Sequence, residues 1–244
     1  LVERMADAVR QMLENAGMTL EQCGGIGIGS PGTIDAKQGV ILYSNNFGWE
    51  NVPIVEELKK HLDVGIEIAN DADAAALGEV CAGAAEGAEN AVLLTLGTGV
   101  GSGVILDKKI FRGAMPGGCE LGHLSIRYDG IRCTCGRKGC LEAYASASAL
   151  LRIAREKAAE HPESIMNEMC GNDLEQMNGK IPFDAAKAGD EAGMETVKEY
   201  EGYLACGIAN VINTFRPEKV ILGGGVAAQK DNLTAPLKDL VKDM

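Results

Sequence analysis

The stretch IVEELKKHLDVGIEIANDADAAALGEVCAGAAEGAENAVLLTLGTGVGSGVIL, residues 54–106, decides the fold class. Its apolar pattern predicts, in order, a helix, a strand, a helix and two strands, over residues 54–62, 65–69, 72–85, 91–96 and 101–106. Alternating helices and strands are typical of an α/β protein. The last two strands follow one another through a short glycine turn with no helix between them. We therefore expect a mixed sheet rather than a wholly parallel one.

Outside this stretch the same patterns predict three more helices, over residues 1–16, 141–160 and 191–215, and a strand over 219–222. A further short buried strand is expected over 24–29, ending in the turn at Ser30-Pro31-Gly32. The first helix begins without an N-capping residue, so we expect the domain to begin upstream of residue 1. Residues 113–142, rich in glycine and cysteine, are expected to be irregular. We place a domain boundary near residue 87, which gives an N-terminal lobe over 1–86 and a C-terminal lobe over 87–244.

The composition is that of an acidic globular protein. Of the 244 residues, 46% are hydrophobic, which is enough to bury one large core or two smaller ones. The formal net charge of −12 argues against nucleic acid as a partner, because binding a phosphate backbone requires clustered Lys and Arg. No apolar run is long enough to cross a membrane, and the opening LVERMADAVRQMLENAG is typical of an amphipathic helix rather than a signal peptide. We expect a cytoplasmic protein without a membrane partner.

Three of the eight cysteines, Cys133, Cys135 and Cys140, cluster in one glycine-rich loop. The others stand singly, in apolar or helical contexts where a reduced thiol packs well. His123 precedes the cluster and completes the Cys3His set that structural zinc sites use. The alternative, buried or disulfide-bonded cysteines, is less typical of clustered Cys with flanking Gly in a cytosolic chain. Four protein ligands leave no open position on the metal, so we expect zinc to staple the loop rather than to catalyse a reaction.

Two glycine-rich segments follow apolar strands and could bring backbone N–H groups close to phosphate oxygens. They consist of Gly97, Thr98, Gly99, Val100 and Gly101, and of Gly224 and Gly225. A tight hairpin explains the first segment equally well, and a helix packed closely on the sheet explains the second. Neither segment is a Walker loop or a dinucleotide fingerprint, so each is a weak signal by itself.

Acidic side chains stand at the end of one predicted strand and on both sides of the cysteine cluster. The strand over 65–69 leads to Asn70 and Asp71. Asp71 could take a proton from a hydroxyl while Asn70 orients the same substrate, or Asp71 could simply cap the following helix. Glu120 and Glu142 bracket the cysteine loop and could accept hydrogen bonds from a polyol. An acid in the first turn of a helix explains Glu142 as well.

Taken together, these segments resemble the ROK family (repressors, open reading frames, kinases), and especially its glucokinases. The matching motifs are Gly29-Ser30-Pro31-Gly32, Asn70-Asp71, Gly97-Thr98-Gly99-Val100-Gly101, Glu120-Leu121-Gly122-His123 and Cys133-x-Cys135-Gly136-x-x-Gly139-Cys140-x-Glu142. The match covers essentially the whole chain, and the cysteine motif followed by glutamate is its specific part. The resemblance implies an α/β fold of the actin/hexokinase-like (ribonuclease H-like) class, a two-lobed ATPase fold with the active site in the cleft and a zinc-stapled loop.

The resemblance also implies roles for single residues. Asp71 corresponds to the catalytic base, and the sugar contacts correspond to Asn46, Asn70, Asp71, Glu120, His123 and Glu142. One ring nitrogen of His123 would bind zinc and the other a sugar hydroxyl. The two glycine segments would hold the nucleotide.

The implied reaction is phosphoryl transfer from Mg²⁺-ATP to the 6-hydroxyl of a hexose, in the first place glucose, in a homodimer or homotetramer. N-acetylmannosamine, N-acetylglucosamine or fructose could replace glucose, because they present similar hydroxyl groups. A ROK repressor would use the same domain to sense a sugar, but the presence of Asp71 and Thr98 favours catalysis. The family's first phosphate loop, Asp-x-Gly-Gly-Thr, is absent, so we expect these residues to represent most, but not all, of a kinase.

Overall fold

The computed structural model describes residues 1–44 and 47–244. The described chain forms two compact units. The first contains Leu1–Gly87 and Gly103–Cys119, and the second contains Ala88–Ser102 and Glu120–Met244. The chain therefore enters the second unit after Gly87, returns to the first for one short segment, and then completes the second.

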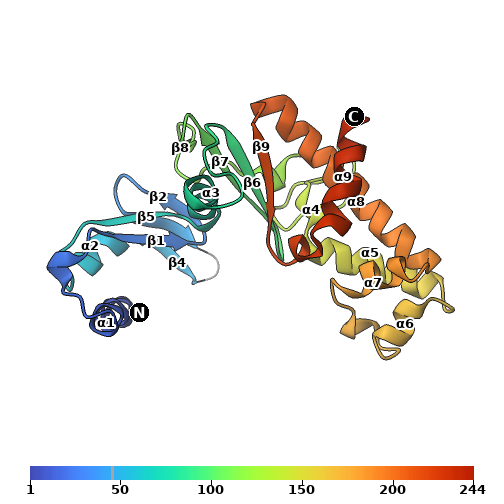
Figure 1. The fold of residues 1–244 in the computed structure, drawn as a ribbon, viewed down its shortest axis with the longest axis horizontal. Coiled ribbons are helices and arrows are strands. Elements are labelled where there is room, and N and C mark those ends of the chain that lie inside the picture. Colours follow the sequence, from blue (N-terminus) through green and yellow to red (C-terminus); the bar gives the residue numbers. More distant parts are fainter. Residues whose placement is uncertain (45–46) are drawn as a thin grey trace. The chain divides into compact units, whose positions relative to one another are not determined.

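A parallel pair of strands and one helix form the centre of the first unit (Figure 1). β1 (Ile26–Ser30) pairs with β5 (Ile66–Asn70), and Ser30 lies opposite Asn70 at the strand ends. α3 (Asp71–Ala82) follows β5 directly and packs against both strands. Its alanine-rich sequence favours a helix and lets its backbone lie close to the strands. The carboxyl end of β5 and the first turn of α3 are therefore one continuous segment.

A three-stranded antiparallel sheet also belongs to the first unit. It contains β2 (Thr33–Asp35), β3 (Val40–Ser44) and β4 (Trp49–Val52). Ile34 and Ile41 pair across β2 and β3, and both are buried. The core of this unit consists of Ile34, Ile41, Ile54, Leu58, Ile66 and Ile68. Branched aliphatic side chains from both sheets thus share one core.

Two further helices, and the hairpin formed by the end of β7 (Val100–Leu106) and by β8 (Lys109–Ile110), also belong to the first unit. α1 (Val2–Asn15) packs against α2 (Ile54–Lys59). Gly17, with a φ of 65°, lies just beyond the end of α1, where glycine tolerates this backbone conformation. β7 pairs antiparallel with β8 through its final residues.

The second unit contains a parallel strand pair, in which β6 is buried and β9 is partly exposed. β6 (Ala91–Leu96) pairs with β9 (Lys219–Gly223), with Leu94 opposite Leu222. Nearly every residue of β6 is buried, which explains why the strand is a continuous apolar run rather than an alternating one. Thr95 at its end introduces the glycine turn at 97–99.

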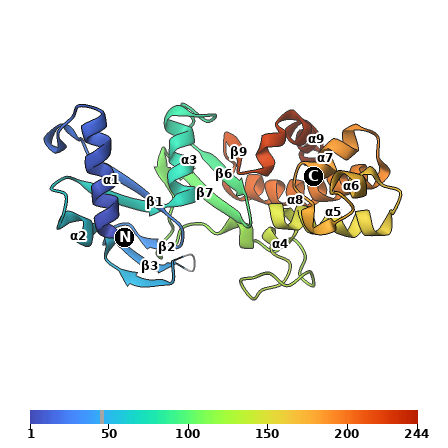
Figure 2. The same ribbon diagram turned by 90° about the horizontal axis from the view of Figure 1, so that it is seen from below.

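Helices cover this strand pair and form a second core (Figure 2). The 25-residue helix α8 (Glu191–Phe215) packs against α5 (Ala147–Glu160), α7 (Ile181–Lys187) and α9 (Asp231–Lys242). The apolar core under these helices and α6 (Ile165–Met169) consists of Ala154, Ala158, Met166, Cys170, Met177, Ile181, Ala185 and Ala192. Cys170 is one of its buried members, as expected of a reduced thiol in an apolar context.

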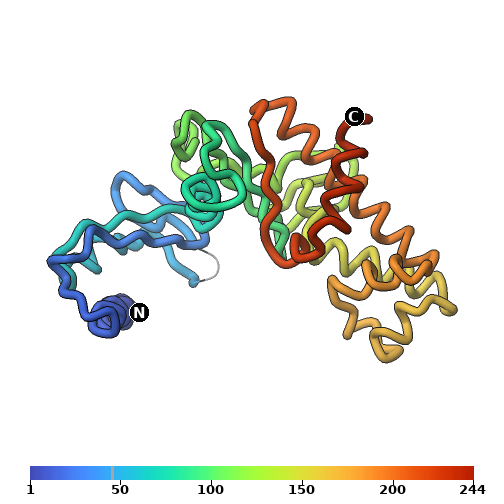
Figure 3. Tube along the Cα trace, viewed as in Figure 1, coloured from blue at the N-terminus to red at the C-terminus, as the bar shows by residue number. Residues whose placement is uncertain are grey.

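Polar residues determine where α8 begins and ends. Asp190 Oδ1 accepts hydrogen bonds from the Gly193 N–H and the Ser164 hydroxyl, each at 2.8 Å, so one carboxylate caps α8 and holds the segment before it. At the other end Arg216 adopts a left-handed backbone conformation, with a φ of 47°. The chain then turns back from α8 into β9 and continues through a short turn into α9 (Figure 3).

The sequence predicted some element boundaries well and others less well. The helix expected over 191–215 is α8, but the helix expected over 141–160 is divided at Ser146 into α4 (Glu142–Ala145) and α5. The division arises because the Ser146 hydroxyl caps α5 by accepting a hydrogen bond from the Ala149 N–H at 3.0 Å. The sheet of β2, β3 and β4 was missed, since strands of three to five residues are too short to show a clear period. Among the described helices, none is long and apolar enough to span a lipid bilayer.

Candidate functional site

The glycine segment 97–101 is the turn that links β6 to β7. The Gly97 N–H donates to the Gly99 carbonyl at 3.0 Å. The beginning of α5 holds this turn, because the Ala147 N–H donates to the Gly97 carbonyl at 2.8 Å and the Ser148 hydroxyl donates to the Thr98 carbonyl at 2.9 Å. The side chain of Thr98 itself is exposed. The loop therefore has a fixed backbone and presents a hydroxyl to solvent.

The carboxylate of Glu142 lies directly against this loop. Glu142 Oε2 accepts a hydrogen bond from the Val100 N–H at 3.1 Å. A Cβ atom on Gly99 would overlap Oε2 and would lie 3.1 Å from Cδ of the same carboxylate. A larger residue at position 99 would therefore displace the Glu142 carboxylate from the loop.

A third segment, 120–123, approaches the same loop closely. A Cβ atom on Gly122 would overlap the carbonyl oxygen of Val100, so this contact also requires glycine. The Leu121 N–H donates to the buried Ser102 hydroxyl at 2.9 Å, and the His123 N–H donates to the Glu120 carbonyl at 3.0 Å. These bonds place exposed Glu120 and half-buried His123 at the two ends of one short turn, η2 (Leu121–His123).

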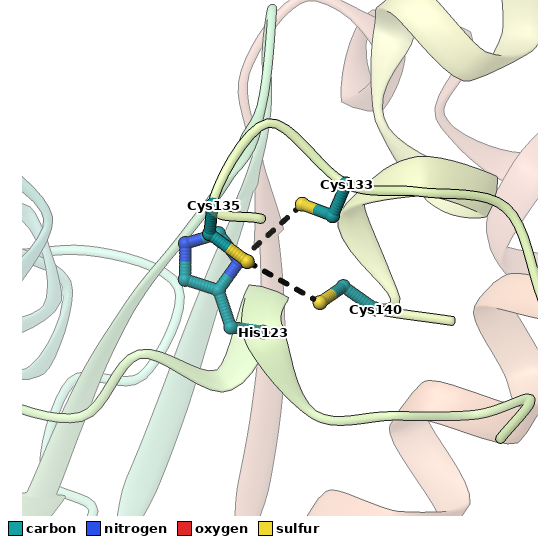
Figure 4. A group of neighbouring side chains, drawn as sticks. All are labelled: His123, Cys133, Cys135 and Cys140. Carbon is teal, nitrogen blue, oxygen red and sulfur yellow. Dashed lines mark hydrogen bonds between the residues drawn. The ribbon is translucent and has the colours of Figure 1, made fainter. Parts of the chain in front are cut away.

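The predicted Cys3His set comes together (Figure 4). One donor atom from each of His123, Cys133, Cys135 and Cys140 lies within 4.8 Å of the others. The Cys133 Sγ lies 3.8 Å from His123 Nδ1, and the Cys135 and Cys140 sulfurs lie 3.6 Å apart. Tetrahedral coordination with Zn–S bonds of about 2.3 Å requires sulfur atoms roughly 3.8 Å apart. The four residues can therefore hold a metal ion, with Nδ1 of His123 as the ligand nitrogen.

The surroundings of the three cysteines affect the pKa values of their thiols differently. Burial raises the pKa of the Cys133 thiol, and burial raises the pKa of the Cys140 thiol to about 12. For exposed Cys135, a hydrogen bond from the Arg137 backbone lowers the pKa. Two buried thiols of raised pKa lose their protons at neutral pH only when a cation compensates the charge, so metal binding at this cluster must release protons.

Asn70 and Asp71 lie at the junction of β5 and α3 in the first unit. The Asn70 side chain caps α3, because its Oδ1 accepts from the Ala72 and Asp73 N–H groups at 2.9 and 3.3 Å. Its Nδ2 donates to the Gly32 carbonyl at 3.2 Å. The suggestion that Asp71 is the cap is therefore wrong: Asp71 is the first helical residue, and its side chain is exposed although Oδ1 also accepts from the Ala72 N–H at 2.9 Å. Asn70 is the N-cap because its backbone is extended, as that of an N-cap residue normally is, whereas Asp71 is already helical.

Gly224 and Gly225 follow β9 and have different surroundings. Gly224 has a φ of 83°, and a Cβ atom there would lie 2.5 Å from the Leu96 carbonyl oxygen, so this glycine permits close packing on β6. Gly225 has no atom near its missing side chain and lines a cavity of about 890 Å³. Lys180 and Lys187 from the region of α7 line the same cavity. Both glycines are exposed, but only Gly225 lines this cavity.

Some structural contacts at the site involve residues that the sequence did not single out. Thr134 Oγ1 donates to Glu142 Oε1 at 3.1 Å, and the buried Tyr144 hydroxyl accepts from the Ile131 N–H at 2.6 Å. The sequence could have marked Thr134 as a site residue only by its position between two candidate metal ligands. Tyr144 has no sequence signal, because its contact joins a helix to a loop that only the fold brings near.

The predicted site residues divide between the two units. Most of the predicted site residues belong to the second unit. They are Glu120, His123, Glu142, the three clustered cysteines and the two glycine segments, 97–101 and 224–225. Asn70 and Asp71 belong to the first unit. Asn46 lies outside the described residues.

Known proteins resemble this chain over its whole length. The sequence profile of the ROK family matches residues 1–244. A glucokinase of Thermotoga maritima is 37% identical over 244 residues, which are 100% of this chain and 75% of that protein. The solved structure of a ROK family glucokinase from Streptomyces griseus, in complex with glucose and AMPPNP, has a TM-score of 0.82 and 30% identity, covering 99% of this chain and 78% of that one. A xylose repressor of Caldicellulosiruptor bescii is 32% identical over 223 residues, 91% of this chain and 55% of the repressor.

Proposed function

The chain belongs to the ROK family, and from this premise we propose that it transfers a phosphoryl group from ATP to the 6-hydroxyl of a hexose, in the first place glucose. The family match and the likeness to a ROK glucokinase confirm the actin/hexokinase-like α/β fold. One observation carries the proposal: Glu142, an acceptor suited to sugar hydroxyls, lies 3.1 Å from a backbone N–H of the glycine loop. An acceptor for a polyol beside a loop suited to phosphate is what a sugar kinase requires.

Hydrogen-bond acceptors and donors are proposed to hold the hydroxyl groups of the sugar. In the second unit, Glu120, His123 and Glu142 bind hydroxyls, with Nε2 of His123 left for the sugar because Nδ1 faces the cysteines. In the first unit, Asn70 and Asp71 bind the hydroxyl that receives the phosphate. Asn70 keeps one amide hydrogen for this purpose, since Nδ2 has two and donates one to Gly32. Asn46 remains a further proposed contact.

The nucleotide would lie along the two glycine segments. Thr98 and the backbone of 97–101 bind phosphate oxygens, with Mg²⁺ neutralising their charge. Gly224 and Gly225 lie on the adenosine side. The cavity at Gly225 supports this assignment, because its volume of about 890 Å³ lies within the range of small-ligand sites and lysines line it.

Asp71 is the proposed general base. Its exposed carboxylate stands at the carboxyl end of a parallel strand, at the start of a helix, where α/β proteins place catalytic groups. It takes the proton from the 6-hydroxyl as the oxygen attacks the γ-phosphorus, and the bond from that phosphorus to the β,γ-bridging oxygen breaks to release ADP. Removal of this proton and correct positioning are the protein's main contributions, because phosphoryl transfer involves little covalent chemistry of the enzyme.

A structural zinc ion is proposed for the Cys3His cluster, where it stabilises the loop that carries the sugar contacts. The ion would have no part in a chemical step, since all four positions are protein ligands. We also propose that residues 1–86 and 87–244 act as the two lobes of the kinase, and that the enzyme is a homodimer or homotetramer.

Two alternatives remain within the family. Another hexose, namely N-acetylmannosamine, N-acetylglucosamine or fructose, could be the substrate, and a panel of hexoses with ATP would identify it. The likeness to a xylose repressor supports a sugar-sensing domain as the second alternative. A protein that binds a sugar without ATP-dependent product formation would favour the repressor.

The test of the proposed reaction is Asp71→Asn in the full-length protein. The helix cap is Asn70, so this substitution removes only the base, and turnover should fall by roughly a hundred- to ten-thousand-fold. Glucose and ATP affinity and the melting temperature should stay near the wild-type values, as measured by calorimetry. Glu67→Gln, which neutralises an exposed carboxylate on the preceding strand β5, is the matched control. Unchanged turnover of Asp71→Asn would refute the role of Asp71.

A further inference from the structure

The carboxylate of Glu142 is held by two loops at once. Its Oε2 accepts from the Val100 N–H of the glycine loop, and its Oε1 accepts from the Thr134 hydroxyl of the cysteine loop, both at 3.1 Å. We propose that Thr134 is a positioning residue for sugar recognition, whose hydroxyl holds the Glu142 carboxylate in the orientation that binds the sugar. The inference rests on the proposed function, in which Glu142 accepts a hydrogen bond from a sugar hydroxyl.

The Thr134 hydroxyl keeps its proton whether or not the cysteine cluster holds a metal. Cys133 Sγ also lies near Glu142 Oε1, at 3.3 Å, and as a thiol it donates to this oxygen. A cysteine bound to a metal is a thiolate and has no proton to donate. The hydroxyl of Thr134 donates in both states, so it can hold Oε1 in the metal-loaded protein.

The position of Thr134 is itself well defined by its neighbours. It stands between Cys133 and Cys135, two of the proposed ligands, so metal binding fixes the backbone on both sides. The loop also closes on itself, because the Cys133 N–H donates to the Arg137 carbonyl at 2.8 Å and the Gly136 N–H donates to the Cys133 carbonyl at 3.0 Å. A metal that orders this loop would therefore also fix the position of the Glu142 carboxylate, through the hydrogen bond from the Thr134 hydroxyl.

Loss of this hydroxyl leaves the carboxylate with its Val100 bond, about which it can rotate. Sugar binding must then order the carboxylate again, which weakens sugar affinity without touching the nucleotide side. Because the bond involves a charged acceptor but an exposed donor, we expect a loss of about three- to tenfold rather than more.

The experiment is Thr134→Val in the full-length enzyme, a change that keeps the shape of the side chain and removes the hydroxyl. The KM for glucose should rise about three- to tenfold, while kcat, the KM for ATP and the zinc content stay unchanged. Thr134→Ser returns the hydroxyl and should restore the wild-type KM. Lys138→Ala, an exposed position in the same loop, is the matched control and should leave glucose binding unchanged.

A double-mutant cycle separates positioning from a general loosening of the loop. If Thr134 acts through Glu142, then Thr134→Val should change the glucose affinity of a Glu142→Ala protein by less than about twofold, as measured by calorimetry. An equal loss in both backgrounds, or an unchanged KM for glucose in an active Thr134→Val enzyme, would overturn the inference while leaving the kinase assignment intact. A wild-type protein that neither binds nor phosphorylates any hexose would overturn both.

Discussion

A single methyl group added at Gly99 tests the contact between the glycine loop and Glu142. The added Cβ of Gly99→Ala would overlap Glu142 Oε2 and lie 3.1 Å from Cδ, closer than such atoms normally pack. The carboxylate must therefore move away from the Val100 N–H, which breaks a 3.1 Å hydrogen bond to a charged acceptor. The backbone at Gly99 does not have the positive φ that would make alanine unfavourable by itself.

The expected size of the effect follows from that one bond. A hydrogen bond to a charged group contributes about 1.5–3 kcal/mol. At about 1.4 kcal/mol for each factor of ten, its loss should lower glucose affinity by roughly 10- to 100-fold, because glucose needs the carboxylate in its original place. Calorimetric titration with glucose in the absence of nucleotide measures this directly.

Gly97→Ala is the matched control for this measurement. It adds the same methyl group to the same loop, but no atom lies within 4 Å of the new Cβ. Glucose affinity without nucleotide should then stay within about twofold of wild type. Equal glucose affinities in the two alanine variants would refute the reasoning, since the overlap with Glu142 occurs in only one of them.

Two further predictions concern the metal and a buried acid. We expect the wild-type protein to bind about one zinc per chain. Cys140→Ser, or removal of the metal by a chelator, should abolish zinc binding, weaken glucose binding and speed hydrogen exchange over 126–139. A wild-type protein free of zinc that binds glucose well would contradict this. Burial raises the pKa of Glu201 in α8 to about 7, above the value of 4.5 for an exposed glutamate, so the folded state binds its proton more tightly and loses stability as the pH rises through this range. The unfolding free energy of Glu201→Gln minus that of wild type should therefore increase from pH 5 to pH 8, by on the order of 3 kcal/mol in denaturant titrations. The same difference at both pH values would contradict a raised pKa for Glu201.

The sequence by itself determined the features whose information is local. The cysteine cluster was visible because Cys133, Cys135 and Cys140 lie within one loop, and the structure brings them together with His123. Helix α8 was predicted over its observed range because the apolar period persists through 25 residues. Repeated or closely spaced signals of this kind need no knowledge of the fold.

Only the tertiary structure decided how these local features are joined. Asn70 and Asp71 are equally good capping residues in the sequence, and the extended backbone of Asn70 selects it as the cap. The close contact of Gly99 with Glu142, and the hydrogen bond from Val100 to Glu142 across 42 positions of sequence, are of this kind. Such contacts depend on which loops the packing of β6, α4 and α5 brings together. The spacing of residues along the sequence does not show which distant residues will be in contact in the folded chain.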